Sequence, residues 1–307
     1  MTLSLAALSY RFVERPIRYG AFSASTLRWL TPASAAALVV LCIATTLRYA
    51  PPTTALQQGI VAPRRAARLA SQRNAQRVMV AGNSVANMLA GEGLAQLVTS
   101  PPSVVLNRGR FSCTFPDADQ ARFGDRDAGH QTIHCTDGWR HDVATFRPDT
   151  VLLLVGDAGV TAYLYDGIWL QPCQAGFAPW YRRGLDGAVA QLGAKGARVV
   201  LVTAPYSRYW GPLEDQRRSA ESTDCTNTAV YEYVSAHPAV GLVDLARFVC
   251  PTDFESCRTL VDGEPLRPDG VHFRGYGARY VSGWMLGQLG LTVVGEQPAS
   301  AKAVSLR

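Results

Sequence analysis

Two apolar patterns alternate along the chain between residues 77 and 289. Short runs such as VLLLV at 151–155 are apolar at every position, which is typical of strands buried on both faces of a parallel sheet. Longer segments with helical spacing follow these runs. We predict strands at Arg77–Ala81, Val104–Leu106, Val151–Val155, Ala197–Thr203 and Val240–Asp244, and helices at Val85–Leu97, Trp180–Ala194, Asp215–Ala236 and Gly275–Leu289. This alternation predicts a three-layer α/β/α fold around a parallel sheet.

Two long segments, 111–148 and 205–225, lack a regular apolar period and contain cysteine, proline and aromatic residues. We predict that both are irregular and shape the surface around a site. The stretch 51–76 is rich in proline, alanine and arginine, which predicts a linker that becomes helical after its last proline. We place the main domain at 77–292 and a flexible tail at 293–307.

An uncharged apolar stretch near the N-terminus reads ASAAALVVLCIATTL at residues 33–47. Together with its neighbours it forms a segment, 30–50, that reaches the roughly 20 residues needed to cross a bilayer core. Trp29 and Tyr49 flank the stretch, as aromatic residues do at membrane interfaces. We therefore predict one transmembrane helix at 30–50.

Arginine is unevenly distributed about this predicted helix. Residues 1–29 contain four arginines and one glutamate, whereas residues 49–63 carry no charge. The positive-inside rule then places 1–29 in the cytoplasm as a juxtamembrane segment and the later domain outside the membrane. We predict a single-pass protein of the cell membrane with an extracytoplasmic domain. A cleaved signal peptide is the alternative, although an apolar run that begins at residue 33 is late for one.

Seven cysteines occur, and six of them follow the predicted membrane helix. None forms a C-x-x-C pair typical of zinc or redox sites. An even set without metal spacing favours three disulfides in an oxidising compartment, with six reduced thiols as the alternative. Six cysteines allow fifteen pairings. We favour Cys250–Cys257 as a local pair, followed by Cys113–Cys135 and Cys173–Cys225.

The net charge of +6 suggests a nucleic-acid partner, but its distribution argues against one. Residues 1–50 hold five arginines and one glutamate, for +4, so the rest of the chain contributes +2. An arginine cluster at 64–77 falls in the predicted linker, where it is typical of a solvated helix face. We expect no nucleic-acid partner. His130, His134 and His141 lack metal-ligand spacing, so we expect no metal and no cofactor.

A serine directly follows the first predicted strand. Gly82-Asn83-Ser84 predicts a tight strand-to-helix turn, and ligands of parallel α/β sheets collect at this end of the strands. There a hydroxyl is exposed and its backbone N–H can help to stabilise an oxyanion; an ordinary helix N-cap is the alternative. Gly109, after the second strand, can supply another oxyanion donor. Asp157, after the third strand, is a candidate rim contact.

The segment RPDGVHF at 267–273 precedes the last predicted helix. Asp269 and His272 lie three residues apart, so the carboxylate can hold the imidazole in one tautomer. His272 can then take the proton of Ser84 while Asp269 stabilises the imidazolium. We predict that Ser84, His272 and Asp269 are catalytic, with Ser84 and Gly109 forming the oxyanion hole.

These residues resemble the sequence blocks of the SGNH (GDSL-like) hydrolase family. Residues 82–84 are similar to its first block, Gly109 to the oxyanion glycine of its second block, and residues 269–272 to its last block. The resemblance implies a flavodoxin-like three-layer sheet. The third block normally reads Gly-x-Asn-Asp, and Gly156-Asp157 lacks the asparagine at the matching place. That departure removes one expected oxyanion donor.

The run SYRFVERPIR at 9–18 is similar to the tail of the acyltransferase-3 membrane family, which ends in a comparable S-Y-x-x-x-E-x-P-x-R pattern. In one branch of that family a further transmembrane helix leads to an extracytoplasmic SGNH domain, in the order seen here. An amphipathic juxtamembrane stretch is the alternative. The sequence holds only this tail of the membrane part, so we expect a truncated product, a split partner or a misplaced start.

The resemblance implies an O-acyltransferase that moves an acetyl or other short acyl group onto cell-surface or secreted glycans through an acyl-enzyme on Ser84. Its expected partners are a glycan acceptor, an acyl donor and a multi-helix acyltransferase of the membrane. With water as acceptor, the same triad makes a carbohydrate esterase or deacetylase. A catalytically inactive glycan-binding or partner-docking module is the third hypothesis, which the missing third-block asparagine favours.

Overall fold

The computed structural model describes residues 62–123, 130–156, 159–208 and 212–295, together with Tyr10, Arg11 and Arg15. The chain divides into two units, Met1–Thr53 and Thr54–Arg307, and the elements described below belong to the second. The predicted membrane helix at 30–50 lies outside the described residues, as do most of the segment 1–29 and the end of the predicted tail. Among the residues that the structure describes, no helix has the length and apolar character needed to span a bilayer.

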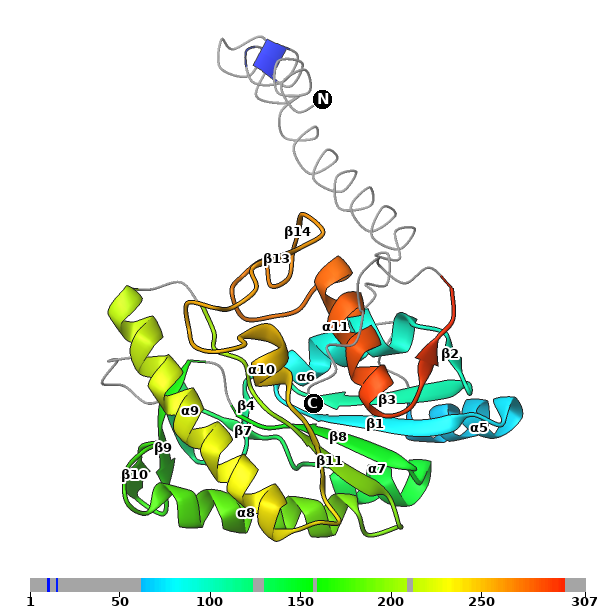
Figure 1. Ribbon diagram of the computed structural model, residues 1–307, viewed down its shortest axis with the longest axis horizontal. Coiled ribbons are helices and arrows are strands. Elements are labelled where there is room, and N and C mark those ends of the chain that lie inside the picture. The colour runs from blue at the N-terminus through cyan, green and yellow to red at the C-terminus, as the bar shows by residue number, and fades with distance from the viewer. Residues whose placement is uncertain are drawn as a thin grey trace, which may run out of the picture. The chain divides into compact units, whose positions relative to one another are not determined.

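Five parallel strands form the central sheet: β1 (Gln76–Gly82), β3 (Ser103–Gly109), β8 (Thr150–Leu154), β11 (Arg198–Val202) and β12 (Gly241–Val243). Their order across the sheet is β12-β11-β8-β1-β3 (Figure 1). Met79 of β1 pairs with Leu106 of β3 on one side and with Val151 of β8 on the other. The strands are apolar along most of their length because both faces of the sheet are covered.

Helices form a layer on each face of the sheet (Figure 1). One layer contains α5 (Pro63–Arg73), α7 (Trp139–Phe146), α8 (Phe177–Leu192) and α9 (Leu213–Ala236). The other contains α6 (Ser84–Met88), η2 (Leu89–Gly93), η3 (Leu94–Gln96), α10 (Leu245–Val249) and α11 (Gly275–Gln288). Met79 belongs to the core that includes Trp139, whereas its neighbour Val80 belongs to the core that includes Val281. The predicted three-layer α/β fold is confirmed.

The observed strands and long helices lie within a few residues of their predicted bounds, but the helix predicted at 85–97 is interrupted. It divides into α6, the π-helical turn η2 and the 3-10 turn η3. Gly93, between the two turns, has φ −113° and ψ −88°, which is not a helical conformation. A Cβ at Gly93 would lie 2.0 Å from Oγ of Ser282 in α11. Close packing of α11 therefore requires a glycine where the regular helix ends.

The predictions that 205–225 and 111–148 are irregular are each wrong in part. The first segment overlaps α9, which begins at Leu213. The segment 111–148 contains α7, in which Trp139, Val143 and Phe146 are buried at helical spacing. Eight residues are too few for this period to stand out in the sequence. A second sheet, also not predicted, has the order β10-β9-β5-β6 and consists of β5 (Gln120–Phe123), β6 (His130–Gln131), β9 (Val160–Tyr165) and β10 (Ile168–Leu170).

Residues on both sides of the predicted domain boundaries pack with the domain. The predicted linker at 51–76 supplies α5, in which Ala66 and Ala70 are buried. At the other end, β15 (Thr292–Val293) pairs with β2 (Thr99–Ser100).

Three disulfides join Cys113 to Cys135, Cys173 to Cys225 and Cys250 to Cys257. These are the pairings favoured by the sequence. The first two bonds connect the loops that follow β3 and β10 to segments further along the chain. The third closes a short loop directly after α10.

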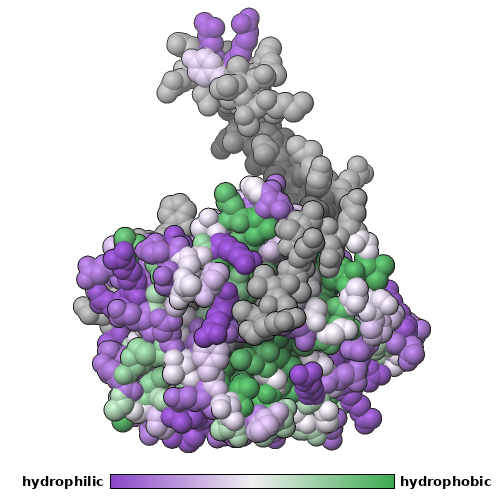
Figure 2. Space-filling view, viewed as in Figure 1, coloured by the Kyte–Doolittle hydropathy of each residue, from purple (hydrophilic) through white to green (hydrophobic). Residues whose placement is uncertain are grey.

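The surface drawn in Figure 2 is mostly hydrophilic and carries separate hydrophobic patches. Large exposed apolar side chains such as Val98, Ile168 and Leu260 lie in separate segments of the chain. Scattered exposed apolar residues of this kind are normal for folded domains, so they carry no functional inference.

Removal of the Cys173–Cys225 disulfide should destabilise the chain more than removal of Cys250–Cys257. The partners are 52 residues apart in the first pair and 7 in the second, and a longer closed loop restricts the unfolded chain more. We expect the Cys173→Ser/Cys225→Ser variant to lose about 2–4 kcal/mol of unfolding free energy, about 1–2 kcal/mol more than the matched Cys250→Ser/Cys257→Ser variant. Urea denaturation of the full chain measures both losses, and equal losses would contradict the loop-length explanation.

Candidate active site

Ser84 lies on the sharp turn between β1 and α6. Gly82 ends β1 with φ +133°, and a Cβ there would lie 2.6 Å from the carbonyl oxygen of Leu154. Asn83 caps α6, because its Oδ1 accepts a hydrogen bond of 3.0 Å from the N–H of Val85. Its Nδ2 donates to the carbonyl oxygen of Gly156 at 2.9 Å. The cap is therefore Asn83, and Ser84 is left half-buried at the first position of the helix with its hydroxyl available to a base.

Asp269 and His272 lie on a tight turn before α11. Both the N–H of Val271 and the N–H of His272 donate to Oδ1 of Asp269, at 3.0 and 2.7 Å. Gly270 has φ +76°, and a Cβ at this position would lie 1.7 Å from the carbonyl oxygen of Arg208. Only glycine fits this conformation and this close approach.

The structure brings the three predicted catalytic side chains into one hydrogen-bonded row. Nε2 of His272 lies 2.8 Å from Oγ of Ser84, and Nδ1 of His272 lies 2.7 Å from Oδ2 of Asp269. With the Nδ1 proton donated to the carboxylate, Nε2 is the nitrogen that can accept the serine proton. This geometry can generate an alkoxide-like nucleophile and can stabilise the imidazolium that forms beside it.

The surroundings of Asp269 favour its ionised form. Burial alone would raise the pKa of this carboxyl. The hydrogen bonds from the N–H and ring of His272 and from the N–H of Val271 outweigh burial, and they hold the pKa of Asp269 below its ordinary value of 3.8. At neutral pH the carboxylate of Asp269 is therefore ionised and can accept the hydrogen bond that orients the ring of His272.

The N–H of Gly109, the predicted oxyanion donor, has a hydrogen-bond partner within its own strand. Its N–H is buried and donates to Oδ1 of Asn107 at 3.0 Å, so it is already used. A Cβ at Gly109 would lie 2.1 Å from the backbone nitrogen of Asn87 in α6. The glycine therefore allows β3 and α6 to pack closely, and the sequence pattern could not separate this role from a catalytic one. The candidate rim residue Asp157 lies outside the described residues.

The segment after β3 passes directly beside the nucleophile turn. The N–H of Arg110 donates to the carbonyl oxygen of Gly82 at 2.9 Å, and Sγ of Cys113 lies 3.5 Å from the same oxygen. The Cys113–Cys135 disulfide thus supports the turn that carries Ser84. Cysteine spacing predicted this bond but gave no sign of its position at the site.

A pocket opens next to the triad and was not predicted. Its lining includes Asn83 and Val85, on either side of Ser84, and Val271, next to His272. Arg267 and Ser207 also line it, and both side chains are at least nine-tenths buried. The pocket thus borders the reacting groups, and its lining includes the buried polar side chains of Arg267 and Ser207.

Of the three histidines in the cysteine-bearing segment, His134 has an acidic neighbour in the described structure. His134 pairs with Asp117 across 3.9 Å. Among the described residues, no group of three or more His, Cys, Asp or Glu side chains could hold a metal ion.

A parallel α/β sheet with a Ser-His-Asp row at the carboxyl ends of its strands defines the class of serine-nucleophile hydrolases. The chain belongs to the family described as SGNH domain (fused to AT3 domains), whose model matches residues 53–285. The predicted family resemblance is thereby confirmed, and the membership supports an enzyme of the hydrolase or esterase type.

Solved structures of related fold are distant in sequence. A GDSL-like lipase from Bacteroides thetaiotaomicron is 14% identical with a TM-score of 0.41, covering 74% of this chain and 98% of its own. An acetyl xylan esterase is 14% identical with a TM-score of 0.43, covering 69% and 99%. A variant acetyl-xylooligosaccharide esterase from Geobacillus Stearmophilus is 15% identical with a TM-score of 0.42, covering 70% and 94%. No curated protein matches the chain.

Replacement of Asp269 should change how the stability of the chain depends on pH. The folded pKa of Asp269 lies below its ordinary value, so the ionised carboxylate stabilises the fold above pH 3.8, and this contribution is lost as the pH falls through the folded value. The unfolding free energy of Asp269→Asn should therefore approach that of the wild type as the solution becomes more acidic.

Denaturation at a series of pH values tests this expectation, with Asp166→Asn as the matched control. Asp166 lies exposed on the turn between β9 and β10 at φ +50°, a conformation that asparagine also adopts. The control should stay parallel to the wild type throughout. A pH-independent gap between wild type and Asp269→Asn would contradict the expectation.

Proposed function

We propose that the chain is a membrane-anchored, extracytoplasmic O-acyltransferase that esterifies cell-surface or secreted glycans with an acetyl or other short acyl group. The observation that carries the proposal is the hydrogen-bonded row of Ser84, His272 and Asp269 in a family defined by fusion to AT3 domains. The row supplies a nucleophile, and the fusion named in the family description supports the proposal that a membrane acyltransferase delivers the acyl group.

The proposed reaction has two balanced halves. Oγ of Ser84 attacks the carbonyl carbon of the acyl donor while Nε2 of His272 takes the hydroxyl proton. The imidazolium then gives this proton to the leaving group as the carbonyl–donor bond breaks, which leaves an acyl ester on Ser84. A sugar hydroxyl next attacks this ester, gives its proton to His272 and leaves acylated, while the proton returns to Ser84.

The extracytoplasmic placement is supported by the cysteines and by the N-terminal pattern. Three disulfides are typical of an oxidising compartment. The arginine-rich segment before the predicted helix at 30–50 favours an N-terminus in the cytoplasm. A multi-helix acyltransferase in the same membrane is the partner that this arrangement would require.

An esterase or deacetylase is the second candidate, and the exposure of the site favours it. Ser84 and His272 are both half-buried, so water can reach an acyl group on the serine. Transferase and hydrolase differ only in which nucleophile resolves the acyl-enzyme. The third candidate, an inactive glycan-binding or partner-docking module, gains some support from Gly109, whose N–H is already bonded to Asn107.

The triad predicts serine-dependent ester cleavage. We expect the full chain to hydrolyse p-nitrophenyl acetate and Ser84→Ala to lower kcat/KM by about 10³-fold or more, since no other group replaces the nucleophile. Ser235→Ala, on the exposed face of α9, is the matched control and should keep the wild-type rate. If Ser84→Ala and the wild type showed equal rates, the inactive-module hypothesis would be favoured instead.

Adding a glycan acceptor separates transfer from hydrolysis. With p-nitrophenyl acetate as donor, a transferase should add the mass of an acetyl group to an oligosaccharide and release p-nitrophenol faster when the acceptor is present. Mass spectrometry of the oligosaccharide measures the first effect. Release of free acetate alone, at a rate independent of the acceptor, would identify an esterase.

A further inference from the structure

Arg267 is a buried cation beside the triad that the reaction above does not use. The residue is 9% exposed, and its Nη1 donates to the carbonyl oxygen of Tyr206 at 2.6 Å. Its guanidinium lies 5.7 Å from the centre of the Phe273 ring. In the part of the chain that the structure describes, no carboxylate lies within ion-pair distance of it. Burying a charge without a counter-charge costs free energy, so the burial of the Arg267 guanidinium calls for an explanation.

The neighbouring charges do not neutralise Arg267. Burial lowers the pKa of Arg267 most, and the positive charge of Arg208 lowers it further. The negative charge of Asp269 raises it, and the resulting pKa is about 10. The guanidinium therefore stays protonated at neutral pH. Asp269 is the carboxylate that acts on it, but its two oxygens already accept from His272 and Val271.

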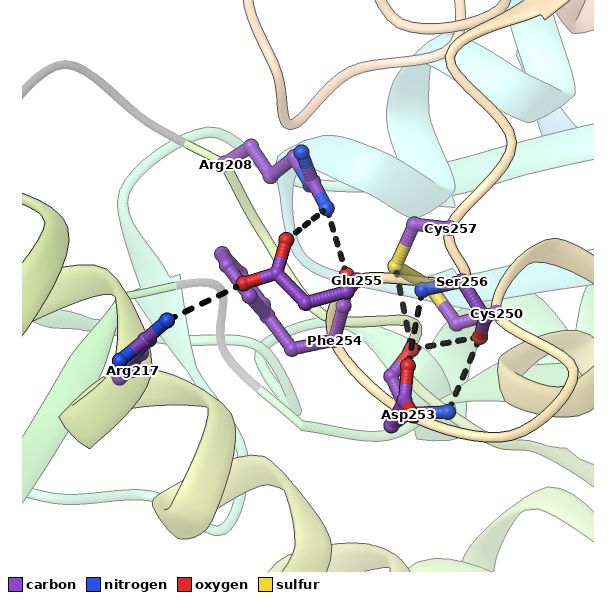
Figure 3. Close-up of polar contacts among 8 residues, drawn as sticks. All are labelled: Arg208, Arg217, Cys250, Asp253, Phe254, Glu255, Ser256 and Cys257. Carbon is purple, nitrogen blue, oxygen red and sulfur yellow. Dashed lines mark hydrogen bonds and ion pairs between the residues drawn. A yellow bond between two sulfur atoms is a disulfide. The ribbon is translucent and has the colours of Figure 1, made fainter.

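Arg208, in contrast, is held and partly neutralised by the loop closed by the Cys250–Cys257 disulfide. Its Nη2 donates to the carbonyl oxygen of Phe254 at 2.7 Å and lies 3.4 Å from Oε2 of Glu255 (Figure 3). Glu255 also pairs with Arg217 at 3.4 Å. Of Arg208 and Arg267, only Arg267 has no acidic side chain within ion-pair distance among the described residues.

The pocket next to Ser84 presents Arg267 on an otherwise mainly apolar lining. Leu154, Ala204 and Pro205 are among its apolar walls. Ser207, which also lines it, is 2% exposed, and its Oγ has no hydrogen-bond partner among the described residues. A guanidinium and an unpaired hydroxyl in a small apolar pocket form a donor set suited to a carboxylate. A pocket for a plain acetyl group would need neither.

We propose that this pocket binds a carboxylate of the substrate, held by Arg267 and Ser207 while the neighbouring ester carbonyl lies at Ser84. The inference rests on the proposed acyl chemistry of Ser84 and narrows its substrate class. The carboxylate has two possible sources, the free end of a dicarboxylic acyl group or an acidic sugar of the glycan. Both present the same anion to the pocket.

Paired esters test the proposal on the full chain. The acyl arm compares mono-p-nitrophenyl succinate with p-nitrophenyl acetate, and the sugar arm compares acetylated glucuronic acid with its methyl ester. We expect Arg267→Gln to lower kcat/KM for the carboxylate-bearing member of one arm by about 10–100-fold, the effect of losing a hydrogen bond to a charged group, and to change its neutral counterpart by less than about threefold. Arg267→Lys should recover part of the loss.

Two further variants keep the result interpretable. Ser207→Ala should weaken the carboxylate preference in the same direction, which covers the case in which Arg267→Gln does not fold. Arg217→Gln, an exposed arginine on α9, should leave the preference unchanged. Equal losses on neutral and charged esters would overturn the proposal, because they would show that Arg267 only holds the Tyr206 segment. A wild type with no carboxylate preference in either arm would overturn it as well.

A binding measurement separates this proposal from the proposed function. In the Ser84→Ala variant no acyl-enzyme can form, yet the pocket is intact, so calorimetry with monomethyl succinate should show binding that is lost in Ser84→Ala/Arg267→Gln. Binding without ester cleavage in the wild type would overturn the acyl chemistry and leave the anion pocket standing. Cleavage of neutral esters without binding of monomethyl succinate would overturn the anion pocket and leave the acyl chemistry standing.

Discussion

The alignment of the site depends on the turn that holds Asp269. One oxygen of this carboxylate accepts two backbone N–H groups, and the other accepts the ring of His272, so a single side chain fixes both the turn and the imidazole. Gly270 makes the turn possible through its positive φ and its close contact with the carbonyl of Arg208. Because the same bonds keep Asp269 ionised, the shape of the turn and its charge have one origin.

Two arginines next to this turn have different roles because their partners differ. Arg208 donates its backbone N–H to the carbonyl of Gly270, and its side chain reaches Phe254 and Glu255 in the disulfide-closed loop. Arg267 has a backbone carbonyl and an aromatic ring as neighbours and faces the pocket. The charged side chain of Arg208 is used to hold the disulfide-closed loop, and only its backbone N–H contacts the turn. The side chain of Arg267 is buried at a low-dielectric pocket, where an anion would interact strongly with it.

The sequence predicted the features that local rules determine. Apolar runs such as 151–155 are typical of buried strands, and the spacing of Asp269 and His272 suits a turn in which one residue orients the other. Several features that depend on tertiary contacts were missed. Gly109 matched a motif position, but the sequence did not show that α6 packs against this glycine or that its N–H donates to Asn107. Arg267 is two residues from Asp269 in the sequence, where it gives no sign that its guanidinium is buried.

The short helix α7 and the second sheet were missed for a related reason. Trp139 and Phe146 are buried because α5 and α8 pack around them. A run of eight residues is too short for its apolar period to predict this burial. Strand β9 follows Gly159 and pairs with β5, a partner about forty residues earlier, through a register shift near Phe123. Pairing over such distances is not encoded in either strand alone.

The serine and the base that serves it are 188 residues apart in the chain. During synthesis the nucleophile therefore emerges long before its histidine, and the hydroxyl that leaves the ribosome is an ordinary alcohol with no activating group. Reactivity arises only when the last helix docks against the finished sheet. Until these two segments pack together, the chain has no activated hydroxyl with which to attack an acyl donor.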